Sequence, residues 1–207
     1  MGKVITVAQQ KGGAGKTTVA VNLAIGLVRA GYSVALLDTD PQGSLGRWFM
    51  TRRDALDDPG VGFGTSSSWG VSYECEKLKR DFDVVIVDTP PKVDSDLRPA
   101  LREADEIIVP VAGSHVDLWA TEGVLDLARR CNKSPRILLN RVKSNTRLGQ
   151  EVAQAAAELE AQLMTSTLAN RVVYAETLGQ GLSVVEAKRS PAWDEIAALL
   201  EELNIAS

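Results

Sequence analysis

Cysteine and histidine are scarce in this chain. Among 207 residues there are two cysteines, Cys75 and Cys131, and a single histidine, His115. Two cysteines do not make a disulfide scaffold or a cysteine-rich metal centre, and one histidine leaves no histidine pair for a zinc hydrolase. A serine–histidine–aspartate triad is improbable for the same reason. The composition therefore argues against the commonest zinc, disulfide and triad chemistries.

The chain also lacks an excess of positive charge and any long apolar run. Lysine and arginine number 23 against 27 aspartates and glutamates, a net charge of -4, so DNA binding by bulk charge is excluded and any contact needs a local basic patch. No window approaches 18 uninterrupted apolar residues, and the first residues lack the apolar core of a signal peptide. We expect a soluble, cytoplasmic protein.

Short β-branched runs alternate with helical patterns. The runs that predict strands are 4–8, 33–37, 83–87, 106–111 and 136–139, and the patterns that predict helices include 16–30, 147–163 and 192–204. Continuous apolar strands indicate a sheet covered on both faces. The expected fold is a doubly wound α/β domain with a mostly parallel sheet and helices on both faces, spanning 1–207 as one domain.

A region rich in glycine and serine interrupts this alternation at 57–72. A domain linker and a surface loop around a weak strand both fit its composition. The alternation of strands and helices resumes immediately after it. This favours the surface loop.

Residues 11–18, KGGAGKTT, follow the first strand and open the first helix. This is the context that a phosphate-binding loop requires, with main-chain N–H groups and a helix N-terminus facing the phosphates. Lys16 is expected to reach the β- and γ-phosphates, Thr17 to bind Mg²⁺ and Thr18 to donate to the α-phosphate. The general pattern has glycine where this chain has Gln10. The rest of the predicted loop is Gly12, Gly13, Ala14 and Gly15.

Acidic residues follow two of the predicted strands. Asp88 ends the run VVIVD, where a carboxylate can hold Mg²⁺ or one of its waters. Asp38 and Asp40 follow the strand that ends at Leu37. Folds of this class bind ligands at the carboxyl ends of their strands, so these carboxylates are expected beside the phosphates.

The segment 11–18 is similar to the deviant Walker A box of the ParA/MinD superfamily of P-loop ATPases, whose hallmark is the extra lysine, here Lys11. DTDPQG at 38–43 resembles the switch I of that family, and VVIVDTPP at 84–91 resembles its Walker B and switch II. The similarity covers essentially the whole chain. Its length is close to that of the short, ParF-like ParA proteins, which lack an N-terminal helix-turn-helix, so none is expected before Val4.

The resemblance implies a slow, Mg²⁺-dependent ATPase that forms a homodimer around two ATP molecules. Lys11 would reach the phosphates bound by the partner subunit, and Asp40 would position the attacking water. With Lys16, these form the implied catalytic set. The implied metal site is Thr17, Asp38 and Asp88. The residues implied to contact or cover adenine are Asn140, Leu168, Asn170 and Arg171.

The resemblance also implies that the protein positions a cargo. The ATP-bound dimer would bind DNA without sequence preference, through Arg171, Lys188 and Arg189, with Lys143 and Arg147 as further candidates. It would be nucleoid-associated in the ATP state, until a cognate partner, ParB-like, ParG-like or a cargo adaptor, stimulates hydrolysis. Plasmid, chromosome and protein-assembly cargoes all fit.

Three related functions are alternatives. A MinD-like membrane positioner needs a basic amphipathic C-terminal helix, but the helix at 192–204 is acidic outside, so no stable membrane association is expected. A nitrogenase iron protein needs bridging cysteines, and none lies between 89 and 110. A P-loop metabolic ligase would be recognised by turnover that a metabolite stimulates. Outside these motifs, Trp69 lies in the serine-rich loop, and the sequence leaves its exposure open.

Overall fold

The computed structural model describes residues 2–91, 94–143 and 146–205, and its centre is one sheet of seven strands in the order β3-β2-β4-β1-β5-β6-β7. Every strand pair is parallel. The expected parallel sheet is therefore confirmed. The strands are β1 (Lys3–Val7), β2 (Val34–Asp38), β3 (Gly62–Thr65), β4 (Val84–Asp88), β5 (Glu106–Ala112), β6 (Arg136–Val142) and β7 (Gln162–Ala169).

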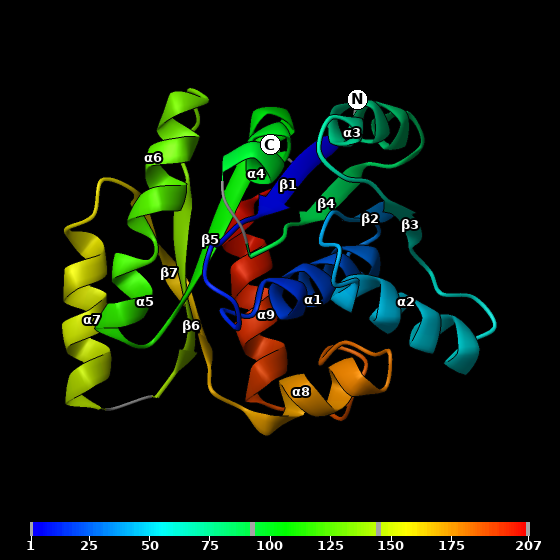
Figure 1. Ribbon diagram of the computed structural model, residues 1–207. Coiled ribbons are helices and arrows are strands. Elements are labelled where there is room, and N and C mark those ends of the chain that lie inside the picture. The colour runs from blue at the N-terminus through cyan, green and yellow to red at the C-terminus, as the bar shows by residue number, and fades with distance from the viewer. Residues whose placement is uncertain (1, 92–93, 144–145, 206–207) are drawn as a thin grey trace.

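Helices cover both faces of this sheet (Figure 1). One face packs against α1 (Lys16–Arg29), α2 (Ser44–Ala55), α8 (Val172–Gly179) and α9 (Pro191–Leu203). The other packs against α3 (Gly70–Asp81), α4 (Asp94–Glu103), α5 (His115–Trp119), α6 (Glu122–Arg130) and α7 (Arg147–Ala157). This is the doubly wound arrangement that the alternating pattern predicts.

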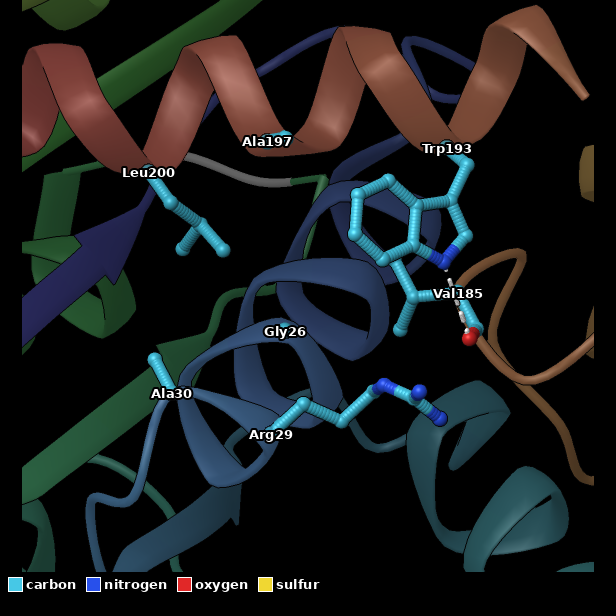
Figure 2. A pocket seen from close by; sticks show the side chains of 7 residues that line it. All are labelled: Gly26, Arg29, Ala30, Val185, Trp193, Ala197 and Leu200. Carbon is cyan, nitrogen blue, oxygen red and sulfur yellow. Dashed lines mark hydrogen bonds between the residues drawn. The ribbon is translucent and has the colours of Figure 1, made fainter. Parts of the chain in front are cut away.

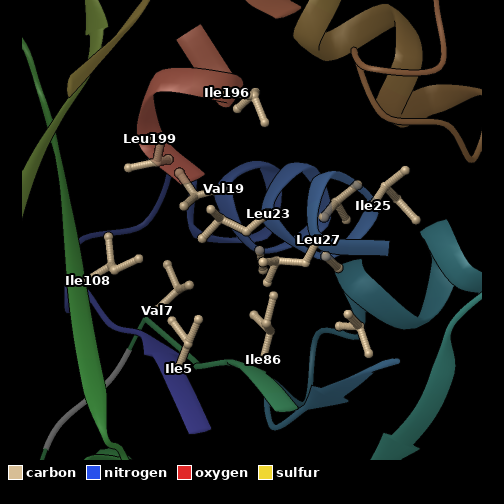
Figure 3. Close-up of a cluster of buried hydrophobic side chains, with 14 of the residues drawn as sticks. Ile5, Val7, Val19, Leu23, Ile25, Leu27, Ile86, Ile108, Ile196 and Leu199 are labelled. Carbon is tan, nitrogen blue, oxygen red and sulfur yellow. The ribbon is translucent and has the colours of Figure 1, made fainter. Parts of the chain in front are cut away.

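The largest buried cluster lies between the sheet and helices α1 and α9 (Figure 3). Ile5 and Val7 of β1 meet Val19 and Leu23 of α1, and all four side chains are fully buried. Parallel strands covered on both faces need such continuous apolar runs. Burial of this face stabilises the start of α1, and with it the loop that joins β1 to α1.

The order of the strands reverses beside β1, which lies between β4 and β5. In open parallel sheets a crevice for ligands forms at the carboxyl ends of the strands at such a reversal. The register places Asp38 of β2 directly beside Asp88 of β4, and Asp88 beside Val7 of β1. The loop after β1 and the two aspartates therefore meet at one edge.

The structure changes the expected end of the helix at 147–163 and shows a strand within the region 57–72. The helix predicted over 147–163 ends at Ala157, and residues from Gln162 form β7 instead. Leu159 and Leu163 continue the helical spacing, but side chains from Met164 onward alternate between buried and exposed, the period of a strand. The weak strand expected within 57–72 is β3, which pairs with β2.

Among the described residues, no helix combines the length and apolar character needed to cross a membrane.

Candidate nucleotide-binding site

The loop between β1 and α1 has the backbone shape of a phosphate cradle. Gly13 and Gly15 have positive φ values of 80° and 90°, which disfavour any residue with a side chain. Gly15 immediately precedes α1, and no side chain caps its first N–H groups. Those donors are available to an anion at the positive end of the helix. A Cβ on Gly12 or Gly13 would meet no atom within 4 Å, so the outer side of the loop is open.

Lys16 is the buried cation of this loop, with 7% of its surface exposed. Burial lowers the pKa of its ammonium group, while the nearby carboxylates of Asp88 and Asp40 oppose that shift. The carboxylates of Asp88, at the end of β4, and Asp40, two residues after β2, are therefore near enough to act on this lysine, which forms no ion pair with a described residue. A bound phosphate would supply the missing negative charge.

Thr17 and Asp88 form the part of the site that suits Mg²⁺. The Thr17 hydroxyl donates to Asp88 Oδ2 at 2.5 Å, and Asp88 Oδ1 is buried without a hydrogen bond from any described residue. Burial raises the pKa of Asp88 to about 7, although Thr17 and Lys16 lower it. A buried carboxylate oxygen without a donor fits a cation. Within the described ranges, no group of three or more histidine, cysteine, aspartate or glutamate side chains is arranged to hold a metal ion.

Asp38 and Asp40 line a neighbouring cavity of about 590 Å³. Asp38 accepts hydrogen bonds from the N–H groups of Gly46 at 2.8 Å and Asp40 at 3.0 Å, while its burial raises its pKa. The Asp40 carboxylate accepts only from the N–H of Gln42, at 2.9 Å, among the bonds of the described residues. Asp38 therefore braces the turn, and Asp40 has free acceptor capacity at the cavity.

The second lysine of the loop, Lys11, has an acidic partner outside the expected motifs. Its ammonium group forms an ion pair with Asp117 of α5, and the Ser114 hydroxyl donates to the other oxygen of that carboxylate. About 36% of the Lys11 side chain remains exposed. Sequence reasoning missed Asp117, because it lies 106 residues away and no recognised motif contains it.

Gln9 is a second residue that sequence reasoning missed. Its buried side chain accepts from the N–H of Gln10 at 2.8 Å and donates to Thr121 Oγ1 at 3.0 Å. These bonds fix the point where the chain leaves β1 for the loop. Gln10, at the position where the general pattern has glycine, lies against Gly123 of α6, where a Cβ would come within 2.4 Å of its Oε1.

A second cavity, of about 370 Å³, is lined by residues of β6 and of the segment that follows β7, and it is the expected place for a base. Among the predicted residues it is lined by Thr18, Asn140, Asn170 and Arg171. Asn140 donates to the carbonyl of Ala14 at 2.8 Å, so it also braces the phosphate loop. The structure does not bring Leu168 to this cavity. Its side chain is 1% exposed and belongs to the hydrophobic core.

The predicted DNA-contacting cations differ in their partners. Arg171 is paired with Glu195 at 2.8 Å, which raises its pKa and neutralises much of its charge. Arg189 is paired with Asp194 at 2.9 Å but is 74% exposed, and Arg147 is paired with Glu151. Lys188 and Lys143 are exposed and make no ion pair with a described residue. The charge of Lys188 and Lys143 is therefore available to a ligand, and Arg189, next to Lys188 in the chain, is exposed although it is paired.

The site and the sheet together define a P-loop nucleotide-binding protein. The loop after the first strand is rich in glycine and holds a buried lysine, a threonine–aspartate pair lies beside it, and the strands are parallel in this order. The family described as the CobQ/CobB/MinD/ParA nucleotide binding domain matches residues 5–184. The chain belongs to this family and is a ParA/MinD-type ATPase.

Individual relatives agree with that assignment. The chain is 31% identical to the maintenance of carboxysome distribution protein A of Halothiobacillus neapolitanus, over 96% of this chain and 95% of that protein. It is 30% identical to the chromosome-partitioning ATPase Soj of Thermus thermophilus, over 96% and 94%. A solved structure of a Cyanothece McdA variant in complex with ATP has a TM-score of 0.80 at 18% identity, covering 98% of this chain and 96% of that one. The chain is thus similar to partition and positioning ATPases.

Proposed function

We propose that this protein is an ATP-dependent partition or positioning ATPase that works as a nucleotide-gated homodimer. One copy of the chain, acting as a single ATPase domain, binds ATP and Mg²⁺ and pairs with a second copy across the two nucleotides. The ATP-bound dimer binds DNA without sequence preference. A partner protein stimulates hydrolysis and releases it, so that a plasmid, a chromosome or a protein assembly is moved or spaced.

The observation that carries the proposal is the position of two lysines on one short loop. Lys16 is buried, with Asp88 and Asp40 near enough to affect its pKa, and it would serve the nucleotide bound by its own subunit. Lys11 is instead paired with Asp117 of α5 and stays partly exposed. A partly exposed cation at a phosphate loop can reach a second molecule once it leaves its acidic partner. There it would act as an arginine finger does, on charge that develops during phosphoryl transfer.

The remaining residues divide the work within one subunit. The loop N–H groups and Lys16 bind the phosphates, and Thr17 with Asp88 holds Mg²⁺, which neutralises phosphate charge when bound. Asp38 keeps the turn after β2 in place through the N–H groups of Gly46 and Asp40. Asp40 has the free oxygen that orients an attacking water.

Lys188 and Arg189 support the DNA-binding part of the proposal. A single subunit with a net charge of -4 presents few cations to DNA. A dimer presents the patch twice, which raises affinity and makes it strongly dependent on salt. DNA binding is therefore expected only with ATP and only at low to moderate salt.

A titration of labelled, non-specific duplex DNA tests the function. Binding is expected with ATP and Mg²⁺ and is lost with ADP or without nucleotide. Lys16→Ala removes binding in every state, and Lys188→Ala with Arg189→Ala weakens it without changing ATP affinity. Binding of equal strength without nucleotide contradicts the gate. Turnover stimulated by a small metabolite, and not by DNA with a partner, would favour a ligase instead.

A further inference from the structure

The segment 181–186, between α8 and α9, is tied to α2 by a buried ion pair. Arg52 of α2 is 4% exposed, and its guanidinium makes a two-pronged contact with Glu186, at 2.8 Å and 2.9 Å. The same group donates to the carbonyl of Gly181 at 3.1 Å. At Gly181 the backbones touch so closely that a Cβ would lie 2.4 Å from the Arg52 nitrogen. The indole of Trp48 adds a bond to the carbonyl of Leu182 at 3.2 Å.

The same segment is also tied to α1, the helix that begins at the phosphate loop. Asn22 accepts from the Ser183 hydroxyl at 2.8 Å and from the N–H of Val184 at 2.9 Å. Its amide nitrogen donates to the carbonyl of Thr18 at 2.7 Å. One buried asparagine therefore joins the segment to the first turn of α1.

Both helices begin at the proposed nucleotide site. The helix α2 begins at Ser44, just after the turn that contains Asp40, and the N–H of Gly46 in its first turn donates to Asp38. The helix α1 carries Lys16 and Thr17 in its own first turn. A nucleotide that changes the position of Asp38 or Asp40 thus acts on an element that holds the segment.

The far end of the segment leads to the exposed cations. Figure 2 shows the Trp193 indole of α9 donating to the carbonyl of Val185, at 3.1 Å. The guanidinium of Arg189 lies 4.8 Å from the centre of the Trp193 ring. A cavity of about 400 Å³ beside this indole, between α1 and α9, leaves space into which the ring can shift. Lys188 and Arg189 follow Glu186 by two and three residues.

We propose that the segment 181–186, held by the Arg52–Glu186 pair, couples the nucleotide site to the Lys188–Arg189 surface. This regulation rests on the proposed function, since it assigns that surface to DNA. A buried charge pair cannot separate without leaving both charges unpaired, which is strongly unfavourable. When α2 moves, the segment 181–186 is therefore expected to move with it. Arg52 and Glu186 are positioning residues and touch neither ligand.

The test compares three proteins by hydrogen–deuterium exchange with and without ATP and Mg²⁺. They are the wild type, the double variant Arg52→Met with Glu186→Met, and the control Arg53→Met, whose exposed side chain makes no ion pair with a described residue. Replacing both charges together leaves neither one buried alone. ATP is expected to change exchange in the peptides covering 187–190 by about fivefold or more in the wild type and the control. In the double variant the change is expected to be below about twofold.

DNA affinity gives the second readout. ATP is expected to raise it by about tenfold or more in the wild type and the control, but by less than about threefold in the double variant. Calorimetry should find ATP affinity within about threefold of the wild type in all three proteins, because the altered residues lie outside the phosphate site. If the double variant does not fold, Glu186→Gln, which keeps the acceptor but removes the charge, is expected to reduce the ATP response at least about twofold.

The outcomes separate the coupling from the function. Wild-type ATP responses in the double variant, or no change at 187–190 when ATP binds the wild type, overturn the coupling. An ATP-dependent exchange change that the double variant loses, in a protein that binds no DNA in any state, upholds the coupling and overturns the proposed DNA function.

Discussion

Lys11 and Asp117 form an ion pair within one subunit, between the phosphate loop and the short helix α5. The proposed dimer requires the same lysine at the phosphates of the partner. One ammonium group cannot make both contacts, because it has to leave Asp117 of α5 to reach the phosphates of the partner. The pair therefore opposes dimerisation in the absence of ATP.

Weakening the pair should make the dimer form more readily. In Asp117→Asn the ion pair is lost while the shape of the side chain is kept. The ATP-dependent dimer is expected to form at about two- to tenfold lower protein concentration than in the wild type. This range follows because a partly exposed ion pair contributes about 1 kcal/mol. Sedimentation at several protein concentrations measures this. The control is Asp126→Asn, an exposed acid on α6 that should have no effect. Weaker dimerisation in Asp117→Asn would show that the carboxylate positions Lys11 for the partner.

The stability of the nucleotide-free protein should depend on pH through Asp88. Its pKa is raised from 3.8 to about 7 by burial, so the folded protein holds this proton more tightly than the unfolded chain. The free energy of unfolding therefore falls as the pH rises from about 4 to about 7. Asp88→Asn removes the buried charge and is expected to be about 1–3 kcal/mol more stable than the wild type at pH 8, with a smaller difference at pH 5.

Urea unfolding at the two pH values measures this difference. Asp126→Asn is again the control, with the same small effect at both. A variant at Asp88 that is less stable than the wild type at pH 8 would contradict the burial argument.

Asn140 links the predicted base cavity to the phosphate loop. In Asn140→Ala the buried bond to the Ala14 carbonyl and the partly buried bond from the N–H of Arg141 are both lost. The expected cost is about 1–3 kcal/mol of stability. ATP affinity should fall by about tenfold or more, because the loop is no longer held in its binding shape. Asn170→Ala, which changes a lining residue of the same cavity but not this brace, should affect affinity without a comparable loss of stability. Thermal unfolding and calorimetry of both variants check the difference.

Local patterns are sufficient for β1, β2, β4, β5 and β6 and for the phosphate loop. A strand covered on both faces is recognisable from its apolar run alone, and the glycines of the loop are dictated by backbone angles at Gly13 and Gly15. The aspartates at the ends of β2 and β4 are also predictable, because parallel strands end at one edge.

Long-range partners were not predictable from the sequence. Asp117 reaches Lys11 only because α5 folds over the end of β5, and no residue near Asp117 indicates this. Arg171 carries little free charge because Glu195, 24 residues later, lies against it. The resemblance implies that Leu168 covers the base, but successive side chains of a strand point to opposite faces. The side chain of Leu168 points into the core. The helix predicted over 147–163 extends into the first two residues of β7, because Leu163 continues the preceding helical spacing.

The most direct test of the account is the mass of Asp40→Ala in solution with saturating ATP and Mg²⁺. This variant keeps every group that binds the phosphates but lacks the carboxylate that orients water, so the nucleotide should persist. Sedimentation is expected to give twice the 22.2 kDa of one chain with ATP, and one chain with ADP or when Lys11→Ala is added. A single-chain mass at saturating ATP, with binding verified by calorimetry, would contradict the nucleotide-gated dimer.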